Sequence, residues 1–516
     1  MSDSCEFQQA VVLRPDDDVA VAVKPLKAGE TIPVDGVEVT LRQDVPPGHK
    51  FALRAAAEDA PIHKYGQIIG FATRDVAVGD HVHTHNLAVK PISFDYEYST
   101  AVPEVAYVPE SERATFQGIS RPNRQVATRN YLAVVSTVNC SASVSRYIAE
   151  RFRGEALKAF PNIDGVVAFT HKAGCAMNIN GADLALLERT LAGCARHPNV
   201  AGYLLCGLGC EVNQASAMIE HTGLTSLTEP TQLPKVVTIQ QEGGVRRAVE
   251  AGVREIERLL PRANDVQRTT HSAAELIVGN ECGGSDAYSG ITGNPAVGAM
   301  VDEVVRHGGT GIIAETPETY GAEHLLTRRA VTPEVGKKLV ALMRWWEDYT
   351  ARNGAEIDNN PAPGNKAGGL TTIYEKSLGA MAKGGSGPLA DVLQYGERVK
   401  TPGFLFMDSP GYDPVSITGL VASGANVVTF TTGRGSCYGC KPVPSLKIAT
   451  NSFLYEHMNE DMDINAGVIL SGVSIEDVGH LIFEKTLAVA SGEKTKSELN
   501  GMGDEEFNPW IIGATL

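Results

Sequence analysis

Cysteines stand at or just after several strand-like runs in the middle of the chain. They are Cys140, Cys175, Cys210 and Cys282, and each has glycine or polar residues beside it. Thiolates bind zinc, iron and iron–sulfur clusters, and a thiolate beside a base can also act as a nucleophile. These four cysteines form no C-x-x-C pair, so their spacing does not favour a zinc ribbon. The alternative is that each packs as a small apolar residue against a neighbouring helix.

Three histidines alternate with other residues in the stretch His81-Val-His83-Thr-His85. Alternate side chains of a strand point to one face, so these imidazoles would lie together. Such a row can bind a divalent metal or transfer protons, although a solvated polar face would have the same pattern. Two more candidates for proton transfer are His171, which follows a strand-like run, and Lys50, which lies in a Gly-His-Lys turn.

Two glycine-rich loops follow strand-like runs and predict an anion-binding site. One is Gly283-Gly284-Ser285-Asp286, and the other is the Thr-Gly-Arg-Gly-Ser stretch around Arg434. Backbone N–H groups of such loops can cradle an anion, and a guanidinium adds two parallel donors for a carboxylate. A plain tight turn is the alternative for either loop. The Gly-Leu-Gly-Cys stretch lacks the third glycine and the acidic residue of a dinucleotide fingerprint, which disfavours a nicotinamide enzyme.

The residues that carry this chemistry are separated by short, nearly continuous apolar runs. Such runs are typical of parallel strands that are covered on both faces, and helix-period stretches lie between them. The carboxyl ends of parallel strands open on one crevice, so the four cysteines and Arg434 could converge there. We expect strands at 130–138, 164–170, 200–207, 235–241, 275–281, 309–316, 403–409, 425–432 and 445–451, and helices at 143–152, 244–260, 331–352, 372–383 and 475–491.

The predicted fold class is α/β, with a small N-terminal all-β domain and a large α/β part whose sheet is mostly parallel. Residues 10–98 contain short β-branched runs between turn signals, which predicts the all-β domain. Residues 99–128 are rich in Pro, Ser, Thr and Arg and predict a linker. A seam rich in Pro, Gly and Asn near 355–370 would split the rest into α/β domains at 129–355 and 356–516.

Composition excludes several classes of protein. The chain has 516 residues, of which 43% are hydrophobic and 21% charged, as in a globular protein. Its formal net charge of -16 repels a phosphate backbone, so we expect no nucleic-acid partner. No apolar run approaches the ~18 residues of a membrane span, and the start has no basic region before an apolar core, so we expect a cytoplasmic protein without a signal peptide. The odd count of Cys 9 also argues against a disulfide framework.

Motifs along nearly the whole chain identify a resemblance. The N-terminal ones are GHKFAL (48–53), KYGQIIG (64–70) and HVHTHN (81–86), and the later ones are GLGCE (207–211), ECGGSDAYSGIT (281–292), NPAPGNKAGG (360–369) and TGRGS (432–436). In this order they resemble the altronate/galactarate dehydratase family, with its N-terminal antifreeze-like (β-clip) domain. Other stretches look closer to its altronate branch: VTLRQDVPPGHKFAL (39–53), ETPETYGAEHLL (315–326), KSLG (376–379) and YGERVKTPG (395–403). One departure is Ser-Cys-Tyr-Gly-Cys at 436–440, where the family continues TGRG with Thr-Pro-Tyr-Gly.

The resemblance implies a metal-dependent hydro-lyase. Its sugar-acid substrate, such as D-altronate, would lose water between C2 and C3 and give a 2-keto-3-deoxy acid, here 2-dehydro-3-deoxy-D-gluconate. The metal would be a divalent ion, Fe²⁺ first and Mn²⁺ second, and an iron–sulfur cluster stays open as an alternative. Our hypothesis assigns the residues by role: metal to Cys140, Cys175, Cys282, His83 and His85; substrate binding to Arg434, Gly283, Gly284, Ser285, Asp286 and Lys366; acid or base chemistry to His171, Lys50 and His85.

Other functions stay open from the sequence. Galactarate or another sugar acid could be the substrate, and a sulfo-lyase would use a similar main domain with another leaving group. A non-catalytic sugar-acid-binding metalloprotein is a second class. A cysteine-nucleophile hydrolase is a third, with His171 and Cys175 as its only local pair. We expect a homo-oligomer, a dimer being the commonest outcome.

Overall fold

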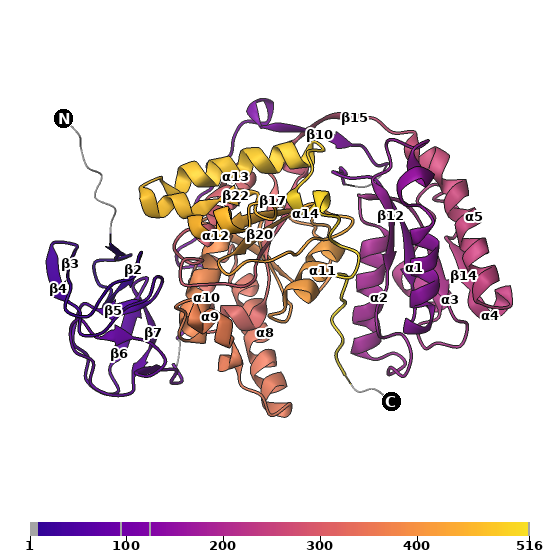
Figure 1. The fold of residues 1–516 in the computed structure, drawn as a ribbon. Helices are drawn as coiled ribbons and strands as arrows, with labels where there is room; N and C mark the ends of the chain where they lie inside the picture. Colours follow the sequence, from indigo (N-terminus) through magenta and orange to yellow (C-terminus); the bar gives the residue numbers. More distant parts are fainter. Residues whose placement is uncertain (1–8, 93–94, 123–124, 514–516) are drawn as a thin grey trace.

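The computed structural model describes residues 9–92, 95–122 and 125–513. Three parts follow one another along the chain: a small β part, a part built on a four-stranded parallel sheet, and a part built on a seven-stranded parallel sheet. The seven-stranded part lies in the middle, with the other two on opposite sides of it (Figure 1). The α/β fold class with an N-terminal all-β region is therefore confirmed.

Short antiparallel strands build the β part. They form the sheets β1-β2-β5-β8, β3-β4 and β6-β7-β9. Buried and more exposed residues alternate in β3 and β6, so that only one face of each is buried. The strands are β1 (Ala10–Val11), β2 (Val19–Ala22), β3 (Thr31–Val34), β4 (Val37–Thr40), β5 (Lys50–Ala52), β6 (Pro61–Lys64), β7 (Gln67–Ala72), β8 (His81–Val82) and β9 (Leu87–Ala88).

The second part has the strand order β12-β11-β13-β14, and all its pairs are parallel. Every residue of β11 and β13 is buried, because helices cover both faces of the sheet. Helices α1 and α5 pack on one face, and α2 and α3 pack on the other. The elements are β11 (Tyr131–Ser136), α1 (Ala142–Glu150), β12 (Gly165–Phe169), α2 (Ala182–Ala195), β13 (Val200–Gly207), α3 (Ala215–Thr222), β14 (Lys235–Thr238), α4 (Ile239–Glu242) and α5 (Val245–Asn264).

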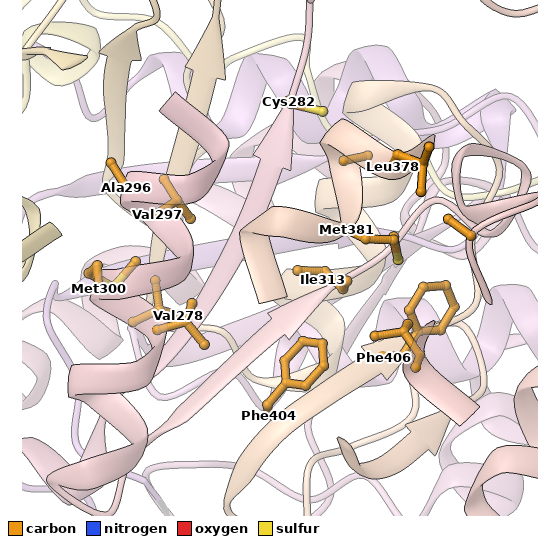
Figure 2. Packing of buried hydrophobic residues seen from close by; sticks show 14 of the residues in the cluster. Val278, Cys282, Ala296, Val297, Met300, Ile313, Leu378, Met381, Phe404 and Phe406 are labelled. Atoms are coloured by element: carbon orange, nitrogen blue, oxygen red, sulfur yellow. The ribbon is translucent and has the colours of Figure 1, made fainter. Parts of the chain in front are cut away.

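The third part has the parallel order β18-β19-β17-β16-β20-β21-β22. Helices α6 and α13 pack against each other on one face, and the core beneath them contains the side chains of Figure 2. Its strands are β16 (Ile277–Cys282), β17 (Thr310–Ile313), β18 (Leu389–Leu393), β19 (Gly403–Met407), β20 (Val427–Thr432), β21 (Ser445–Ala449) and β22 (Ile464–Asn465). Its helices are α6 (Gly293–Arg306), α7 (Glu323–Arg328), α8 (Pro333–Arg352), α9 (Pro363–Ala367), α10 (Ile373–Met381), α11 (Asp413–Ser423), α12 (Ser452–His457), α13 (Ile475–Ala490) and α14 (Lys496–Leu499).

The two α/β parts divide at a different place from the expected one. Strands β16 and β17 pair with β20 and β19, so they belong to the seven-stranded sheet rather than to a domain that ends at 355. The seam at 355–370 instead carries α9 inside the third part. The expected linker at 99–128 contains β10 (Thr115–Ile119), which pairs with β15 (Arg268–Ser272). Helix α11 packs on α2, so one apolar core continues across both sheets.

Within the described ranges, no helix is both long and apolar enough to cross a membrane.

Candidate functional site

Three histidines of the β part form a compact cluster. The ligand nitrogens of His49, His81 and His83 all lie within 4.8 Å of one another. His49 Nδ1 and His81 Nε2 are 3.0 Å apart, and the rings of His81 and His83 are stacked. His85 is exposed beside them, with its ring centroid 5.3 Å from that of His81. Three imidazole nitrogens this close can hold one divalent ion.

Local backbone structure explains how these histidines come together. Strand β8 ends at Val82, and the turn that follows is fixed because Asn86 Oδ1 accepts a hydrogen bond from the backbone N–H of His83. Of the three histidines expected on one strand, only His81 lies in the strand, and His83 and His85 lie in the turn that follows it. His49 was not among the predicted ligands, because a lone Gly-His-Lys turn usually lies on a surface. Only the antiparallel pairing of Lys50 with Val82 places it beside the other histidines.

The imidazoles of this cluster are held in the neutral form. Burial, with Lys50 and the neighbouring histidines, lowers the pKa of His83 to about 3. Burial, with the neighbouring histidines, lowers the pKa of His81 to about 4. His83 Nδ1 is buried and has no hydrogen-bond partner among the described residues. A neutral imidazole is the form that binds metal, so a cation would satisfy this nitrogen.

A cavity of about 670 Å³ lies between the β part and the third part. It borders the histidine cluster, because His49 Nε2 is 3.3 Å from the carbonyl of Ala367 in the cavity wall. The exposed side chain of Arg434 lines it, and no described residue pairs with the guanidinium. The walls include Val23 and Pro47 from the β part, and Asp286, Tyr288, Gly368 and Asn451 from the third part. A small anion could therefore reach a free guanidinium here.

The Gly283–Asp286 loop positions the arginine, and the N–H groups of Gly283 and Asp286 are bonded within the protein. The carbonyl of Gly284 accepts the N–H of Arg434, whereas the N–H of Gly283 donates to Thr431. Asp286 is buried, and its carboxylate accepts hydrogen bonds from Ser289 N and Oγ, Thr450 Oγ1 and Asn451 Nδ2. The buried Ser285 Oγ has no partner among the described residues. Lys366 is half-exposed on the short helix α9, next to Ala367.

Lys50 takes part in a buried ion-pair network between the β part and α10. Its ammonium donates to Glu375 at 2.9 Å and to the carbonyl of Gly369 at 2.7 Å. Lys64 donates to the other oxygen of the same carboxylate at 2.8 Å. Burial lowers the pKa of Lys50 to about 8, while the two ammonium groups lower the pKa of Glu375. These contacts give Lys50 a role in docking the β part.

Cys282 lies in a second polar cluster, buried at the end of β16 (Figure 2). Its Sγ is 2.9 Å from Lys383 Nζ, and its thiol lies within 4.8 Å of ligand atoms of Glu315 and Glu318. Burial and neighbouring carboxylates raise the pKa of Glu315 well above its usual value. Lys376 Nζ donates to Glu318 at 2.6 Å. The sequence does not predict these acids as partners of Cys282, since only the folded sheet brings them together.

The remaining predicted residues lie in the second part of the chain. Cys140 and Cys175 are exposed there and lie in no group with the histidines. His171 is buried, its Nε2 donates to the carbonyl of Ser136, and its Nδ1 accepts the N–H of Ala173. Burial lowers the pKa of His171 to about 4. Both ring nitrogens of His171 are thus occupied by hydrogen bonds that fix the loop. This arrangement does not favour His171 as a general base or as the base that activates a cysteine nucleophile.

Three family models together match nearly the whole chain. Their descriptions are "Altronate/galactarate dehydratase SAF domain" for residues 8–90, "D-galactarate dehydratase/Altronate hydrolase, second domain" for 118–264, and "D-galactarate/Altronate dehydratase, C-terminal" for 273–515. The three matches follow the three parts of the structure, including the division between the two sheets.

Relatives with three different activities are similar to the chain. An altronate dehydratase of Escherichia coli (strain K12) is 38% identical over 98% of this chain and 100% of its own length. A galactarate dehydratase (L-threo-forming) of the same organism is 39% identical over 96% of this chain and 95% of its own. A (2R)-sulfolactate sulfo-lyase subunit beta of Chromohalobacter salexigens is 30% identical over 77% of this chain and 97% of its own.

Proposed function

The chain belongs to the altronate/galactarate dehydratase family, and on that premise we propose that it removes water from an aldonate such as D-altronate. The product is 2-dehydro-3-deoxy-D-gluconate. The observation that carries this proposal is the cavity lined by an unpaired Arg434, whose wall residue Ala367 contacts His49 of the neutral histidine cluster. The full-length similarity to an altronate dehydratase supports the choice of a hydro-lyase.

The reaction needs three groups around the substrate. A base takes the proton from C2, the electron pair forms a C2–C3 double bond, and the C3 hydroxyl leaves as water with a proton from an acid. The enol then rearranges to the 2-keto acid. Because C2 is next to a carboxylate, the negative charge that develops there must be stabilised by positive groups. Arg434 in the cavity wall binds this carboxylate, assisted by Lys366, which stands next to the wall residue Ala367 on α9.

His49, His81 and His83 would hold the divalent metal that the family implies. Their neutral rings and the unsatisfied His83 Nδ1 fit such an ion, with Fe²⁺ as the first candidate and Mn²⁺ as the second. When bound, the ion supplies a Lewis acid that polarises an oxygen of the substrate. This assignment leaves Cys282 outside the metal site, because its thiol is buried against Lys383 in a different cluster.

His85 carries the proton transfer in this proposal. It is exposed next to the cluster, and burial by its neighbours lowers its pKa, so the ring is neutral near pH 7 and can accept a proton. The variant His85→Ala should lose turnover while it keeps its bound metal. Unchanged turnover with normal metal content would remove His85 from the mechanism.

The decisive experiment compares substrates with the anaerobically purified, Fe²⁺-loaded protein. We expect a keto acid from D-altronate, and none after His81→Ala, whose metal content should fall. Galactarate as the preferred substrate would move the assignment to the second candidate, which the 39% identical relative favours. Sulfite released from (2R)-sulfolactate would indicate the sulfo-lyase alternative, and binding of the acids without any product would indicate a non-catalytic metalloprotein.

A further inference from the structure

A thiol and an amine are in direct contact inside the third part. Cys282 Sγ lies 2.9 Å from Lys383 Nζ. Cys282 is the last residue of β16 (Figure 2), and Lys383 belongs to the short 3₁₀ helix η7 (Ala382–Gly384), which directly follows α10. The two residues are 101 positions apart in the sequence, and the packing of η7 on α6 and β17 brings them together. The tertiary fold therefore makes this contact.

Burial isolates this pair from water and from competing partners. Cys282 is 3% exposed and Lys383 is 1% exposed. Lysine is almost never fully buried unless it is paired, and its usual partner is a carboxylate. Here the carboxylate oxygens of Glu281 and Glu315 are each 4.0 Å from Lys383 Nζ, so the thiol is a closer partner than either of them.

The fold holds a carboxyl group beside the pair at some cost. Glu315 has a φ of 68°, which is uncommon for a residue with a side chain. Both oxygens of its carboxyl group are buried, and neither has a hydrogen-bond partner among the described residues. A carboxyl group without a fixed partner, next to an amine, can take up or return a proton when that amine reacts. The surroundings of Cys282 and Lys383 thus suit a reaction that moves protons.

The distance between the two atoms fits a covalent bridge through one oxygen atom. In an N–O–S bridge, nitrogen and sulfur are bonded to the same oxygen, so atoms that already lie 2.9 Å apart need only a small shift. A direct S–N bond would need a far larger movement of two packed elements. The thiols of Cys194 and Cys206 are buried as well, yet among the described residues neither accepts a hydrogen bond from a lysine. Cys282 is therefore the thiol placed for this chemistry.

We propose that Cys282 and Lys383 form a redox-sensitive modification site, at which dioxygen converts the thiol and the amine into an N–O–S bridge. One oxygen atom becomes the bridge, and the other leaves as water. The O–O bond, the S–H bond and one N–H bond break, while an S–O bond, an N–O bond and the two O–H bonds of water form. Sulfur and nitrogen each lose two electrons, which the two oxygen atoms take up. Two equivalents of a dithiol return these electrons and restore the thiol and the amine.

The bridge would affect the loop that holds Arg434. Cys282 directly precedes the Gly283–Asp286 loop, and the carbonyl of Gly284 accepts the backbone N–H of Arg434. A bridged nitrogen is also a much weaker base than an amine, so the neighbouring carboxylates lose the positive charge that Lys383 supplies. We therefore expect the bridged protein to bind the substrate carboxylate less well, an effect that rests on the proposed function.

Mass spectrometry tests the bridge on the full-length chain. The protein is purified without oxygen, exposed to air and digested. The digest should then contain a cross-linked pair of peptides that carries Cys282 and Lys383 and exceeds the sum of the two peptides by about 14 Da, one oxygen added and two hydrogens lost. A dithiol reductant should separate the two peptides, whereas a methyl group on lysine, which adds the same mass, would neither cross-link them nor be removed. The peptide with the buried Cys206 should stay unmodified in the same sample.

Variants and kinetics complete the test. Cys282→Ala and Lys383→Arg should each abolish the cross-link, and Cys206→Ala is the matched control that should keep it, with thermal unfolding as the check on each fold. If a buried variant does not fold, the wild-type digest still decides the question.

Three results would overturn the bridge: no cross-linked peptides after exposure to air, oxygen added to Cys282 alone as a sulfenic or sulfinic acid, or a metal ion held by the Cys282 thiolate. For the wild type, kcat/KM for D-altronate should fall about fivefold on bridging and recover with the reductant. Unchanged kinetics in the bridged protein would reject the effect on Arg434. The mass measurement needs no substrate, so absence of turnover in every form would count against the dehydratase proposal and not against the bridge.

Discussion

A single side chain, Arg434, provides the free positive charge of the proposed substrate cavity. It is exposed and lacks an ion-pair partner in the described part of the chain, so its replacement should not disturb the fold. Arg434→Lys keeps the charge but loses the paired donors, and kcat/KM for D-altronate should fall about 10- to 100-fold, mostly through KM. Steady-state kinetics measures this, with Arg254→Lys on α5 as a control. Unchanged kinetics for Arg434→Lys on every sugar acid would show that the carboxylate binds elsewhere.

The buried His171 should make the stability of the fold depend on pH. Burial lowers its pKa from 6.5 to about 4, so between these values the unfolded chain binds a proton that the folded protein does not. The stability linked to His171 is therefore present above pH 6.5 and lost as the pH falls toward 4, by about 3 kcal/mol.

The variant His171→Asn isolates this effect. Asparagine can still accept the N–H of Ala173 but does not titrate. The variant should be less stable than the wild type at pH 7, and its midpoint of thermal unfolding should fall less steeply between pH 6.5 and pH 4.5. An equal slope in the two proteins would mean that other groups carry the acid sensitivity.

The ion-pair network joins the β part to helix α10, because one carboxylate of α10 pairs with two buried ammonium groups of the β part. Glu375→Gln would leave Lys50 and Lys64 without a negative partner and should lower the free energy of unfolding by about 3–5 kcal/mol. Proteolysis between the β part and the rest of the chain should become faster, since the ion pairs that hold the two together are lost. Glu484→Gln, at an exposed position of α13, is the control and should stay within about 0.5 kcal/mol of the wild type. Wild-type stability of Glu375→Gln would refute a docking role.

Most strands and helices could be predicted from the sequence because their signals are local. The buried run at 200–207 became β13 with the same bounds, and the helical stretch at 331–352 became α8. The site was harder, because its residues meet only through pairing between strands. His49 joins the cluster through the β5–β8 register, and Cys282 meets Glu315 through β16 and β17. The spacing of these residues in the sequence indicates neither contact.

At the scale of the whole molecule, the order of strands in the sheets decides which loops meet. A sequence read in order suggests that all strand-end cysteines face one crevice. The structure places β11, β12 and β13 in one sheet and β16 in another, so Cys282 separates from the other three thiols. The Pro- and Gly-rich seam at 355–370 does not separate two domains, because it forms a loop of the cavity wall.

The arrangement of the three parts makes a last prediction, since the proposed site needs both the β part and the third part. Lys50 donates to Gly369 and Glu375, and the hydroxyl of Tyr288 donates to the carbonyl of Ala22 at 2.9 Å, so the contact is specific and partly buried. Residues 1–90 and 91–516, co-expressed as two chains, should therefore assemble and dehydrate D-altronate. The larger chain alone should be inactive because it lacks the histidines and one wall of the cavity. Co-purification and the keto-acid assay measure both, and Glu375→Gln in the two-chain protein should weaken co-purification, because no covalent connection then compensates for the lost ion pairs. Full activity of the larger chain by itself would place the chemistry outside the β part and reject the histidine cluster as the catalytic metal site.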